Sequence, residues 1–331
     1  MVCPRFSDSP IVSLSCFMSS RFPDGVVAAS LTPFHEDLSV DADALAAHVQ
    51  WLLERGCDGV LLFGTTGEGL SLSVAERIGA LDAVLEAGVA PERLLVGTGA
   101  AALPDAVQLT RAAARRTVGG ALVLPPFHFR QVPPEGLYRF YDRLVREVAT
   151  DALRLYFYHF PALSGVPIPF PLMQRLREAH GAQIAGIKDS SAEWDHTEAL
   201  CRDFPALQVF SGTERLLLPV LEAGGAGCIS ATVNVTAPLA AQVRREWDTA
   251  TDPAASQDRL RTLRAAFASV PTIPALKQLL ARGTGPSPWD TVRPPLAPLG
   301  PEPARAVEAI AEQLVDAGLA PTLNGGPAST A

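Results

Sequence analysis

The chain has 331 residues, of which 27 are Lys or Arg and 35 are Asp or Glu, giving a formal net charge of −8. This acidic balance argues against a nucleic acid or an anionic membrane surface as partner, because both favour basic proteins. The length is enough to bury a large core without a metal or a disulfide. Widely spaced cysteines with no CxxC pair predict reduced thiols in a cytoplasmic protein; they are Cys3, Cys16, Cys57, Cys201 and Cys228.

The N-terminal segment 1–22 precedes the regular part of the chain. Its apolar run PIVSLSCFM (10–18) lacks the basic start and the small-residue cleavage site of a signal peptide. No stretch of the chain approaches the roughly 20 apolar residues of a membrane span. We therefore expect residues 1–22 to be a loose extension and the protein to have no membrane partner.

From Val26 onward, eight short apolar runs alternate with stretches of helical period. Near-continuous hydrophobicity, instead of strict alternation, is typical of strands that are buried on both faces of a parallel sheet. Eight such repeats in about 225 residues predict a closed (β/α)8 barrel, a TIM barrel. The runs are 26–31, 59–64, 93–99, 120–126, 153–160, 183–189, 207–212 and 227–231.

Helical windows lie between these runs, at 42–54, 74–87, 105–116 and 135–148. Asp41 is a candidate N-cap of the first window, and Ser73 with Glu76 forms a candidate capping box for the second. The structural rival, an open doubly wound sheet, usually carries a Gly-rich phosphate turn after its first strand, which SLTPFHED (30–37) does not resemble.

We predict four segments along the chain. The barrel occupies residues 23–250, and a C-terminal helical appendage occupies 251–318. The appendage contains helical stretches near 257–268, 274–281 and 303–317, linked by a Pro-rich loop at 285–303. Residues 319–331 are expected to be a frayed tail.

The chain contains only two lysines, so a lysine nucleophile must be one of them. Lys277 lies in a helical stretch of the appendage, where we expect it on a solvated face. Lys188 ends the sixth strand, and period-two alternation places it on one face with Ile184 and Gly186, whose small size leaves space beside the amine. If that face lines the barrel, desolvation disfavours the ammonium form, as a lysine nucleophile requires. The alternative is a strand-end lysine that pairs with Asp189.

Polar residues at neighbouring strand ends are candidates for proton transfer and for carboxylate binding. Tyr158 lies near the end of strand five, beside Lys188, and its phenol can shuttle a proton; the alternative is a packed wall tyrosine. Strand two ends in GTTGEG (64–69), where hydroxyls and loop N–H groups of Thr65 and Thr66 can hold a carboxylate. Glu68 of the same loop is expected to be buried and bonded to loop N–H groups, outside the chemistry.

Four segments together resemble the dihydrodipicolinate synthase / N-acetylneuraminate lyase family of class I pyruvate aldolases. Their order and spacing match this family from about Val26 to Gly318. The resemblance implies that Lys188 is the Schiff-base lysine, that Tyr158 shuttles protons, and that Thr65 and Thr66 hold the carboxylate of pyruvate. The segments are GTTGEGLSLSVAER (64–77), YHFPALSGVP (158–167), GIKDSS (186–191) and GGAGCISATVN (224–234).

The same resemblance implies further properties. Ile229 matches the position whose backbone carbonyl lies near the Schiff base. Members of the family are usually homotetramers built from tight dimers, so a homotetramer is expected here. No metal and no organic cofactor is expected, because the covalent imine on Lys188 performs the chemistry and the sequence shows no His/carboxylate ligand motif.

Two departures from the family pattern bear on the substrate. Dihydrodipicolinate synthases carry an arginine for a second carboxylate where this chain has Leu163, and a leucine has no guanidinium fork. The family often places a tyrosine in the strand-four loop, which here reads PPFHFRQV (125–132). In the family this loop reaches across the dimer into the site of the partner subunit, so the relay from Thr65 through Tyr158 to a tyrosine of the partner is incomplete here. His128 is a candidate replacement for that tyrosine, and Arg130 is a candidate ligand for a second carboxylate.

The sequence thus predicts a pyruvate-dependent lyase that cleaves or condenses a 4-hydroxy-2-oxo acid, with small-molecule 2-oxo acids as its partners. A dihydrodipicolinate (4-hydroxy-tetrahydrodipicolinate) synthase of lysine biosynthesis is the alternative within the same chemistry, disfavoured by Leu163. A sugar-acid dehydratase is a related alternative. A non-catalytic 2-oxo-acid binding protein remains open as well, because a fold does not by itself determine a function.

Overall fold

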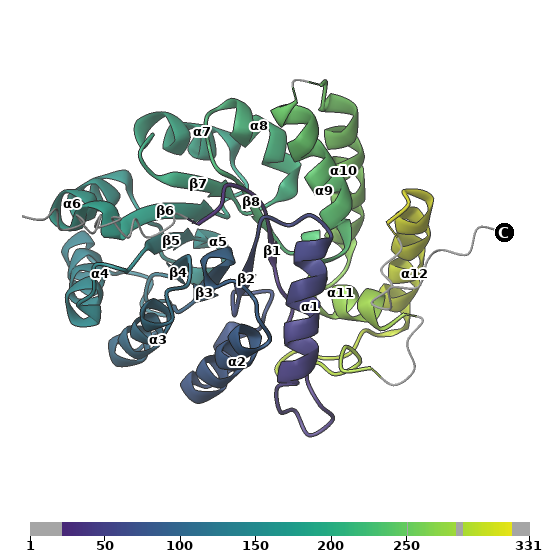
Figure 1. Cartoon of the computed structure of the whole chain (residues 1–331), viewed down its shortest axis with the longest axis horizontal. Coiled ribbons are helices and arrows are strands. Elements are labelled where there is room, and N and C mark those ends of the chain that lie inside the picture. Colours follow the sequence, from purple (N-terminus) through teal and green to yellow (C-terminus); the bar gives the residue numbers. More distant parts are fainter. Residues whose placement is uncertain (1–21, 250, 283–286, 320–331) are drawn as a thin grey trace, which may run out of the picture.

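Eight parallel strands close into a barrel in the order in which they occur in the chain. The computed structural model describes residues 22–249, 251–282 and 287–319. Each strand pairs with its two sequence neighbours, and β1 closes the barrel against β8 (Figure 1). The predicted fold is confirmed. The strands are β1 (Gly25–Ala29), β2 (Gly59–Leu62), β3 (Leu94–Gly97), β4 (Gly120–Val123), β5 (Leu155–His159), β6 (Ile184–Asp189), β7 (Gln208–Ser211) and β8 (Gly227–Ser230).

Helices surround the barrel and cover its outer face (Figure 1). The barrel helices are α1 (Ala42–Glu54), α2 (Val74–Glu86), α3 (Leu103–Arg115), α4 (Pro134–Val148), α6 (Phe170–His180), α7 (Trp194–Asp203), α8 (Leu217–Glu222) and α9 (Val233–Asp248). The short α5 (Pro161–Ser164) follows β5, and the appendage contains α10 (Ala254–Ala266), α11 (Thr272–Ala281) and α12 (Pro301–Asp316). Single 3-10 turns are η1 (Gly69–Ser71), η2 (Pro91–Arg93), η3 (Gly181–Gln183), η4 (Glu214–Leu216) and η5 (Phe267–Ser269).

Two helix starts follow directly from their sequence. The side chain of Asp41 accepts a hydrogen bond from the Ala44 N–H, as expected for an N-cap. Ser73 and Glu76 form both bonds of a capping box at the start of α2. These caps satisfy N–H groups that a helix leaves open in its first turn.

Aromatic and aliphatic side chains fill the interior of the barrel. Phe22 packs edge-to-face against Tyr156 and Phe210, with ring centroids 6.1 and 6.0 Å apart. Its ring also lies against Gly59 at a strand start, so it closes the N-terminal end of the barrel. The expectation that residue 22 belongs to a loose extension is therefore wrong at its last residue, because Phe22 is buried in the core. Residues 1–21 lie outside the described part of the chain.

Strand β6 contains a register shift that alters which side chains face inward. Leu155 of β5 pairs with Ile184, but the next residue, Tyr156, pairs with Gly186. Ile184 consequently packs in the layer between strands and helices, while Gly186 and Lys188 lie on the inner side. The predicted shared face for Ile184 is wrong, because simple alternation does not survive such an irregularity. Gly186 makes room for the ring of Tyr156, not for the amine.

The C-terminal appendage packs against the barrel side that carries α1 and α9 (Figure 1). Its buried side chains, among them Leu263, Leu276 and Trp289, belong to one hydrophobic cluster with residues of β1, β2 and α1. Leu319, which we expected to begin a frayed tail, is buried in that same cluster. Residues 320–331 lie outside the described part. Among the described residues, no helix combines the length and apolar character needed to cross a bilayer.

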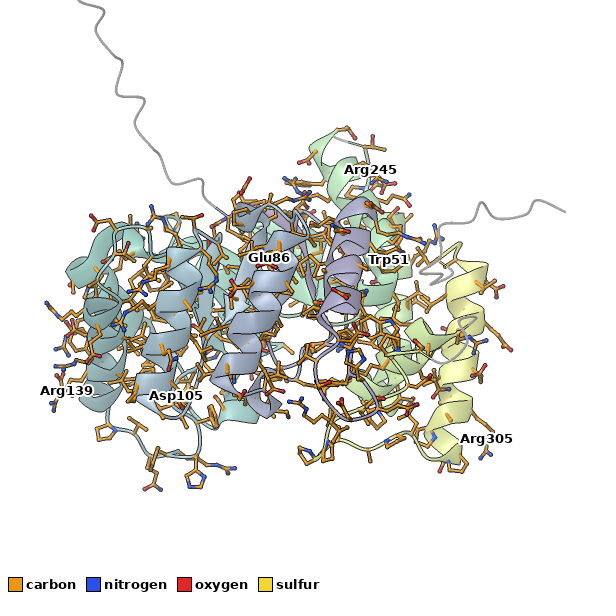
Figure 2. All side chains as sticks on the ribbon, turned by 60° about the horizontal axis from the view of Figure 1, so that its bottom comes forward. Trp51, Glu86, Asp105, Arg139, Arg245 and Arg305 are labelled. Carbon is orange, nitrogen blue, oxygen red and sulfur yellow. The ribbon has the colours of Figure 1, made fainter. Side chains whose placement is uncertain are left out.

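The two ends of the barrel are marked by side chains on the outer helices (Figure 2). Asp105, near the start of α3, and Arg139, early in α4, lie toward the bottom of that view. Glu86 at the end of α2 and Arg245 near the end of α9 lie toward the top. Each barrel helix runs antiparallel to the strand before it, so the helix begins at the end of the barrel where that strand finishes. The carboxyl ends of the strands therefore face the bottom of Figure 2. That is the end at which TIM-barrel enzymes carry their active sites.

Candidate active site

Lys188 lies at the carboxyl end of β6 and is only 4% exposed. Its Nζ donates to the hydroxyl of Tyr158 at 3.4 Å and lies 4.5 Å from the centre of that ring. The adjacent Asp189 does not pair with this amine; its carboxylate accepts hydrogen bonds from Ser191, His196 and Thr197. The alternative of a Lys188–Asp189 ion pair is therefore not realised, and the amine faces the barrel mouth.

Tyr158 connects Lys188 to the loop that follows β2. Its hydroxyl lies 3.2 Å from Oγ1 of Thr65, so one phenol contacts both the amine and the threonine. Thr66 is buried beside it and lines the same cavity. Three strand ends thus bring together Lys188, Tyr158, Thr65 and Thr66. A hydroxyl held between an amine and a second hydroxyl is well placed to move a proton to or from a bound reactant.

A cavity of about 400 Å³ opens over these residues. The strand ends supply one part of its lining, and the appendage supplies another part through Pro271–Pro274 of the α10–α11 connection and the start of α11. Volumes of several hundred Å³ are typical of small-molecule sites. The appendage is therefore a wall of the site and not a separate unit remote from it.

A buried ion pair joins Glu68, in the loop that carries Thr65 and Thr66, to Lys277 on α11. Nζ of Lys277 lies 2.6 Å from Oε1 of Glu68, and the Lys277 side chain is 1% exposed. The expected solvated position of Lys277 is wrong. Glu68 is buried as expected, but its carboxylate forms an ion pair with this lysine, and among the described residues no loop N–H group donates a hydrogen bond to it. Burial lowers the pKa of Lys277, and the charge of Glu68 only partly offsets this. The amine also donates to the backbone carbonyl of Thr291 at 3.0 Å.

A second cluster of titratable side chains includes Asp189, the residue that follows Lys188 on β6. His159, Asp189 and His196 each bring one potential ligand atom to within 4.8 Å of the others, a grouping of the kind that can hold a metal ion. Sequence inspection missed it because its members come from β5, β6 and α7. The imidazole rings of His159 and His196 stack with centroids 4.6 Å apart.

Protein partners already occupy most of the donor and acceptor atoms of this cluster. Nδ1 of His159 accepts the Ile168 N–H at 3.1 Å, and Asp189 accepts the hydroxyl of Thr197 at 2.6 Å. Burial lowers the pKa of His159 to about 4, whereas the hydrogen bond to Asp189 raises the pKa of His196. Burial alone would raise the pKa of Asp189, but its hydrogen bonds lower it overall. The cluster holds the end of β6 in place beside the amine.

Three other predicted site residues do not line the cavity. His128 and Arg130 are exposed in the loop after β4, and the Arg130 side chain packs over Gly165 instead of pointing to Lys188. Neither residue therefore lines the cavity of its own chain, and their roles stay predictions. Ile229 is buried inside the barrel on β8, but it too is absent from the lining. Leu163, which stands where related synthases carry arginine, is 55% exposed.

Polar residues that sequence inspection did not select complete the lining. Ser190, Thr213 and Thr272 are among the lining residues, and Arg264 of α10 is another. Arg264 is one of 25 arginines and lies on an amphipathic helix outside the barrel repeats, so its sequence context carries no signal. Only the packing of α10 against the barrel brings it to the mouth.

Comparison with known proteins identifies relatives over nearly the whole chain. The sequence profile of the dihydrodipicolinate synthetase family matches residues 22–314. The chain is 38% identical over 294 residues to a Chloroflexus aurantiacus protein described as an uncharacterized DapA-like lyase, covering 88% of this chain and 97% of that one. It is 32% identical over 290 residues to 4-hydroxy-tetrahydrodipicolinate synthase of Synechococcus sp. (strain CC9605), covering 85% and 92%. The crystal structure of dihydrodipicolinate synthase from Agrobacterium tumefaciens str. C58 aligns with a TM-score of 0.78 at 34% identity, covering 88% of this chain and 99% of that one.

Proposed function

Because the chain belongs to the dihydrodipicolinate synthetase family, we propose that it is a class I lyase in which Lys188 forms a Schiff base with pyruvate. The substrate is a 4-hydroxy-2-oxo acid, which the enzyme cleaves or forms by condensation. One observation carries this proposal: the buried Nζ of Lys188 lies 3.4 Å from the Tyr158 hydroxyl, which lies 3.2 Å from Thr65. Amine, proton carrier and carboxylate-binding loop therefore meet in one cavity.

The proposed reaction begins when the Lys188 amine adds to the C2 carbonyl of pyruvate and water leaves, giving a protonated imine. Loss of a proton from the methyl carbon gives an enamine. This carbon attacks the carbonyl carbon of an aldehyde, and the oxygen takes a proton, a transfer that we assign to Tyr158. Hydrolysis of the imine releases the product and restores Lys188. Cleavage is the reverse, with the imine accepting the electron pair of the breaking bond, so no metal or organic cofactor is required.

The loop after β2 orients pyruvate in this scheme. Hydroxyl and N–H groups of Thr65 and Thr66 bind the carboxylate, so that C2 lies next to the amine. The backbone carbonyl of Ile229 on β8 is proposed to lie near the imine. Both Thr65 and Thr66 contact the same cavity as Lys188, which supports the first assignment.

The choice of aldehyde separates the leading function from its nearest alternative. Relatives at 32 to 34% identity are named as synthases that form 4-hydroxy-tetrahydrodipicolinate or dihydrodipicolinate, and this favours the synthase as the second candidate. Leu163 weighs against it, because an exposed leucine offers no fork for the carboxylate of aspartate semialdehyde. We therefore place cleavage or formation of other 4-hydroxy-2-oxo acids first.

A trapping experiment tests the proposed function. Sodium borohydride added with pyruvate is expected to reduce the imine and attach a pyruvyl-derived mass to Lys188, located by peptide mass spectrometry, with loss of activity. Trapping at Lys277 or at neither lysine contradicts the proposal, and so does a Lys188→Ala variant that still exchanges the methyl hydrogens of pyruvate. Turnover of aspartate semialdehyde by the wild type and by Leu163→Arg decides between the two candidates. If the leading function is correct, the wild type turns this aldehyde over slowly and Leu163→Arg turns it over faster.

Two remaining alternatives are distinguishable in the same assays. A sugar-acid dehydratase would release water and a new 2-oxo acid instead of pyruvate, and a non-catalytic binding protein would not exchange the methyl hydrogens of pyruvate. A homotetramer of tight dimers is the proposed assembly. Phe129, 63% exposed in the loop after β4, and Leu163, 55% exposed on α5, support a protein contact at this side of the mouth.

A further inference from the structure

A guanidinium group from the appendage lines the active-site cavity, and within the described part of the chain no acceptor forms a hydrogen bond with it. Arg264 lies in the last turn of α10 and lines the same cavity as Lys188. Its Nε is buried, and no acceptor in the described ranges 22–249, 251–282 and 287–319 bonds to it. Leaving a buried charged donor unpaired is costly, so an arginine in this state usually has a ligand or water as its partner.

The carboxylate nearest to Arg264 does not satisfy it. Oε2 of Glu214 lies 4.0 Å from Nε, which is beyond hydrogen-bonding distance. Glu214 is fully buried, and its two oxygens accept hydrogen bonds from the hydroxyls of Ser230 and Thr232. Glu214 therefore balances part of the positive charge but leaves the planar N–H fork open. Such a fork matches the paired oxygens of a carboxylate or a phosphate.

The position of Arg264 is fixed by contacts elsewhere on α10. Seven residues earlier, and so on the same face of the helix, Gln257 donates to the backbone carbonyl of Glu214 at 3.1 Å and accepts the Leu218 N–H at 2.9 Å. These bonds tie α10 to the segment that follows β7. The guanidinium is thus held at the mouth by a rigid element, which is what precise recognition requires.

We propose that Arg264 binds an anionic group, a carboxylate or a phosphate, on the aldehyde component of the reaction. This inference rests on the proposed pyruvate chemistry: Thr65 and Thr66 take the carboxylate of pyruvate, so a second anion belongs to the other reactant. Hydroxyl groups of Ser190, Thr213 and Thr272 line the same cavity and suit a hydroxylated carbon chain. The cation missing at Leu163 thus comes from α10.

The test compares three aldehydes that share a 2-hydroxyaldehyde frame and differ at the far carbon. These are glyceraldehyde, which is neutral, glyceraldehyde 3-phosphate, and tartronate semialdehyde, which carries a carboxylate. In condensation with pyruvate, the wild type is expected to use one of the anionic aldehydes with a kcat/KM at least tenfold above that of glyceraldehyde. Arg264→Gln should lower this kcat/KM about 100-fold or more and change that of glyceraldehyde less than threefold. The anionic aldehyde with the higher kcat/KM shows whether Arg264 binds a carboxylate or a phosphate.

The controls separate recognition from folding. Arg259→Gln, an exposed position on the same helix, should retain the wild-type preference. Arg264→Lys keeps the charge beside Glu214 and should recover only part of the lost kcat/KM. Borohydride trapping by pyruvate alone should be unchanged in Arg264→Gln, which shows that its site is intact. A wild type that traps pyruvate but does not prefer either anionic aldehyde, or a variant that loses all three aldehydes equally, overturns this inference alone. A wild type that does not trap pyruvate overturns the proposed function.

Discussion

At the scale of single residues, the site depends on one hydroxyl group with two partners. Tyr158 lies between the Lys188 amine at 3.4 Å and the Thr65 hydroxyl at 3.2 Å. The other tyrosine of β5, Tyr156, instead bonds to Gln208 inside the barrel. Tyr156 and Tyr158 are two residues apart on one strand, so both side chains point into the barrel but at different depths. One therefore lies in the core and the other at the mouth.

Replacing Tyr158 with Phe removes the proposed proton carrier and leaves the ring in place. We expect the kcat for aldol cleavage or condensation to fall by about 10² to 10⁴-fold, the usual contribution of a general acid or base. Tyr141→Phe is the matched control, because its hydroxyl contacts the Val123 carbonyl outside the barrel interior. Steady-state kinetics with both variants measures the effect. Comparable rates in Tyr158→Phe and Tyr141→Phe would show that the Tyr158 hydroxyl has no part in the reaction.

At the scale of elements, a buried ion pair joins the carboxylate-binding loop to the appendage. Glu68 lies in the segment after β2 with a left-handed backbone (φ 52°), and Lys277 lies on α11. The Lys277 amine also lies 4.3 Å from the ring centre of Phe34, on the loop after β1. The amine also donates to the backbone carbonyl of Thr291, in the connection between α11 and α12. Three connecting segments and one helix therefore meet at a single pair of charges, which holds the loop of Thr65 and Thr66 in place.

Lys277→Met should leave the carboxylate of Glu68 buried without its partner. Removing one member of a buried pair typically costs about 3–5 kcal/mol, whereas removing both charges costs much less. We therefore expect Lys277→Met to lower the free energy of unfolding by about that amount and Glu68→Gln/Lys277→Met to recover most of it, measured by urea unfolding. The KM for pyruvate should rise in the single variant as the loop loosens. A double variant whose loss equals the sum of the two single losses would show that the charges are not coupled.

At the scale of the whole molecule, two neutral histidines link stability to pH. Burial lowers the pKa of both His48 and His159 to about 4, against an ordinary value of 6.5. A histidine whose pKa is lower in the folded protein than in the unfolded chain makes its full contribution to stability above pH 6.5. This contribution is lost as the pH falls from 6.5 toward 4, because the unfolded chain takes up the proton at a higher pH than the folded protein does. His196 has the opposite sign: its pKa is raised, so its contribution is full below pH 6.5 and is lost above.

As the pH falls from 6.5 to 5.0, the decrease in the free energy of unfolding should therefore come mainly from His48 and His159. Each should contribute about 2 kcal/mol at pH 5.0, since one pKa unit corresponds to about 1.4 kcal/mol. His159→Asn, whose Oδ1 can still accept the Ile168 N–H, should remove about half of this pH dependence in urea unfolding. His128→Asn, at an exposed site, should leave it unchanged. An unfolding free energy that stays constant from pH 6.5 to 5.0 would contradict the prediction.

Much of this architecture follows from local sequence. The eight apolar runs coincide with the eight strands to within about two residues at most ends, and Asp41, Ser73 and Glu76 cap helices where expected. Lys188, Tyr158, Thr65 and Thr66 could be selected because a barrel collects its strand ends at one mouth. Hydrophobic period and position along a strand are properties of neighbouring residues, so the chain itself displays them.

Tertiary packing decided what local sequence does not encode. The register shift in β6 turned Ile184 outward, and docking of the appendage buried Lys277 against Glu68 and brought Arg264 into the cavity. The partners of each of these side chains lie far away in sequence, and whether a charged residue is solvated or buried depends on which surfaces meet. The amino-acid sequence by itself therefore determined the barrel and the proposed catalytic residues at its mouth. Only the folded structure decided that Arg264 lines the same cavity.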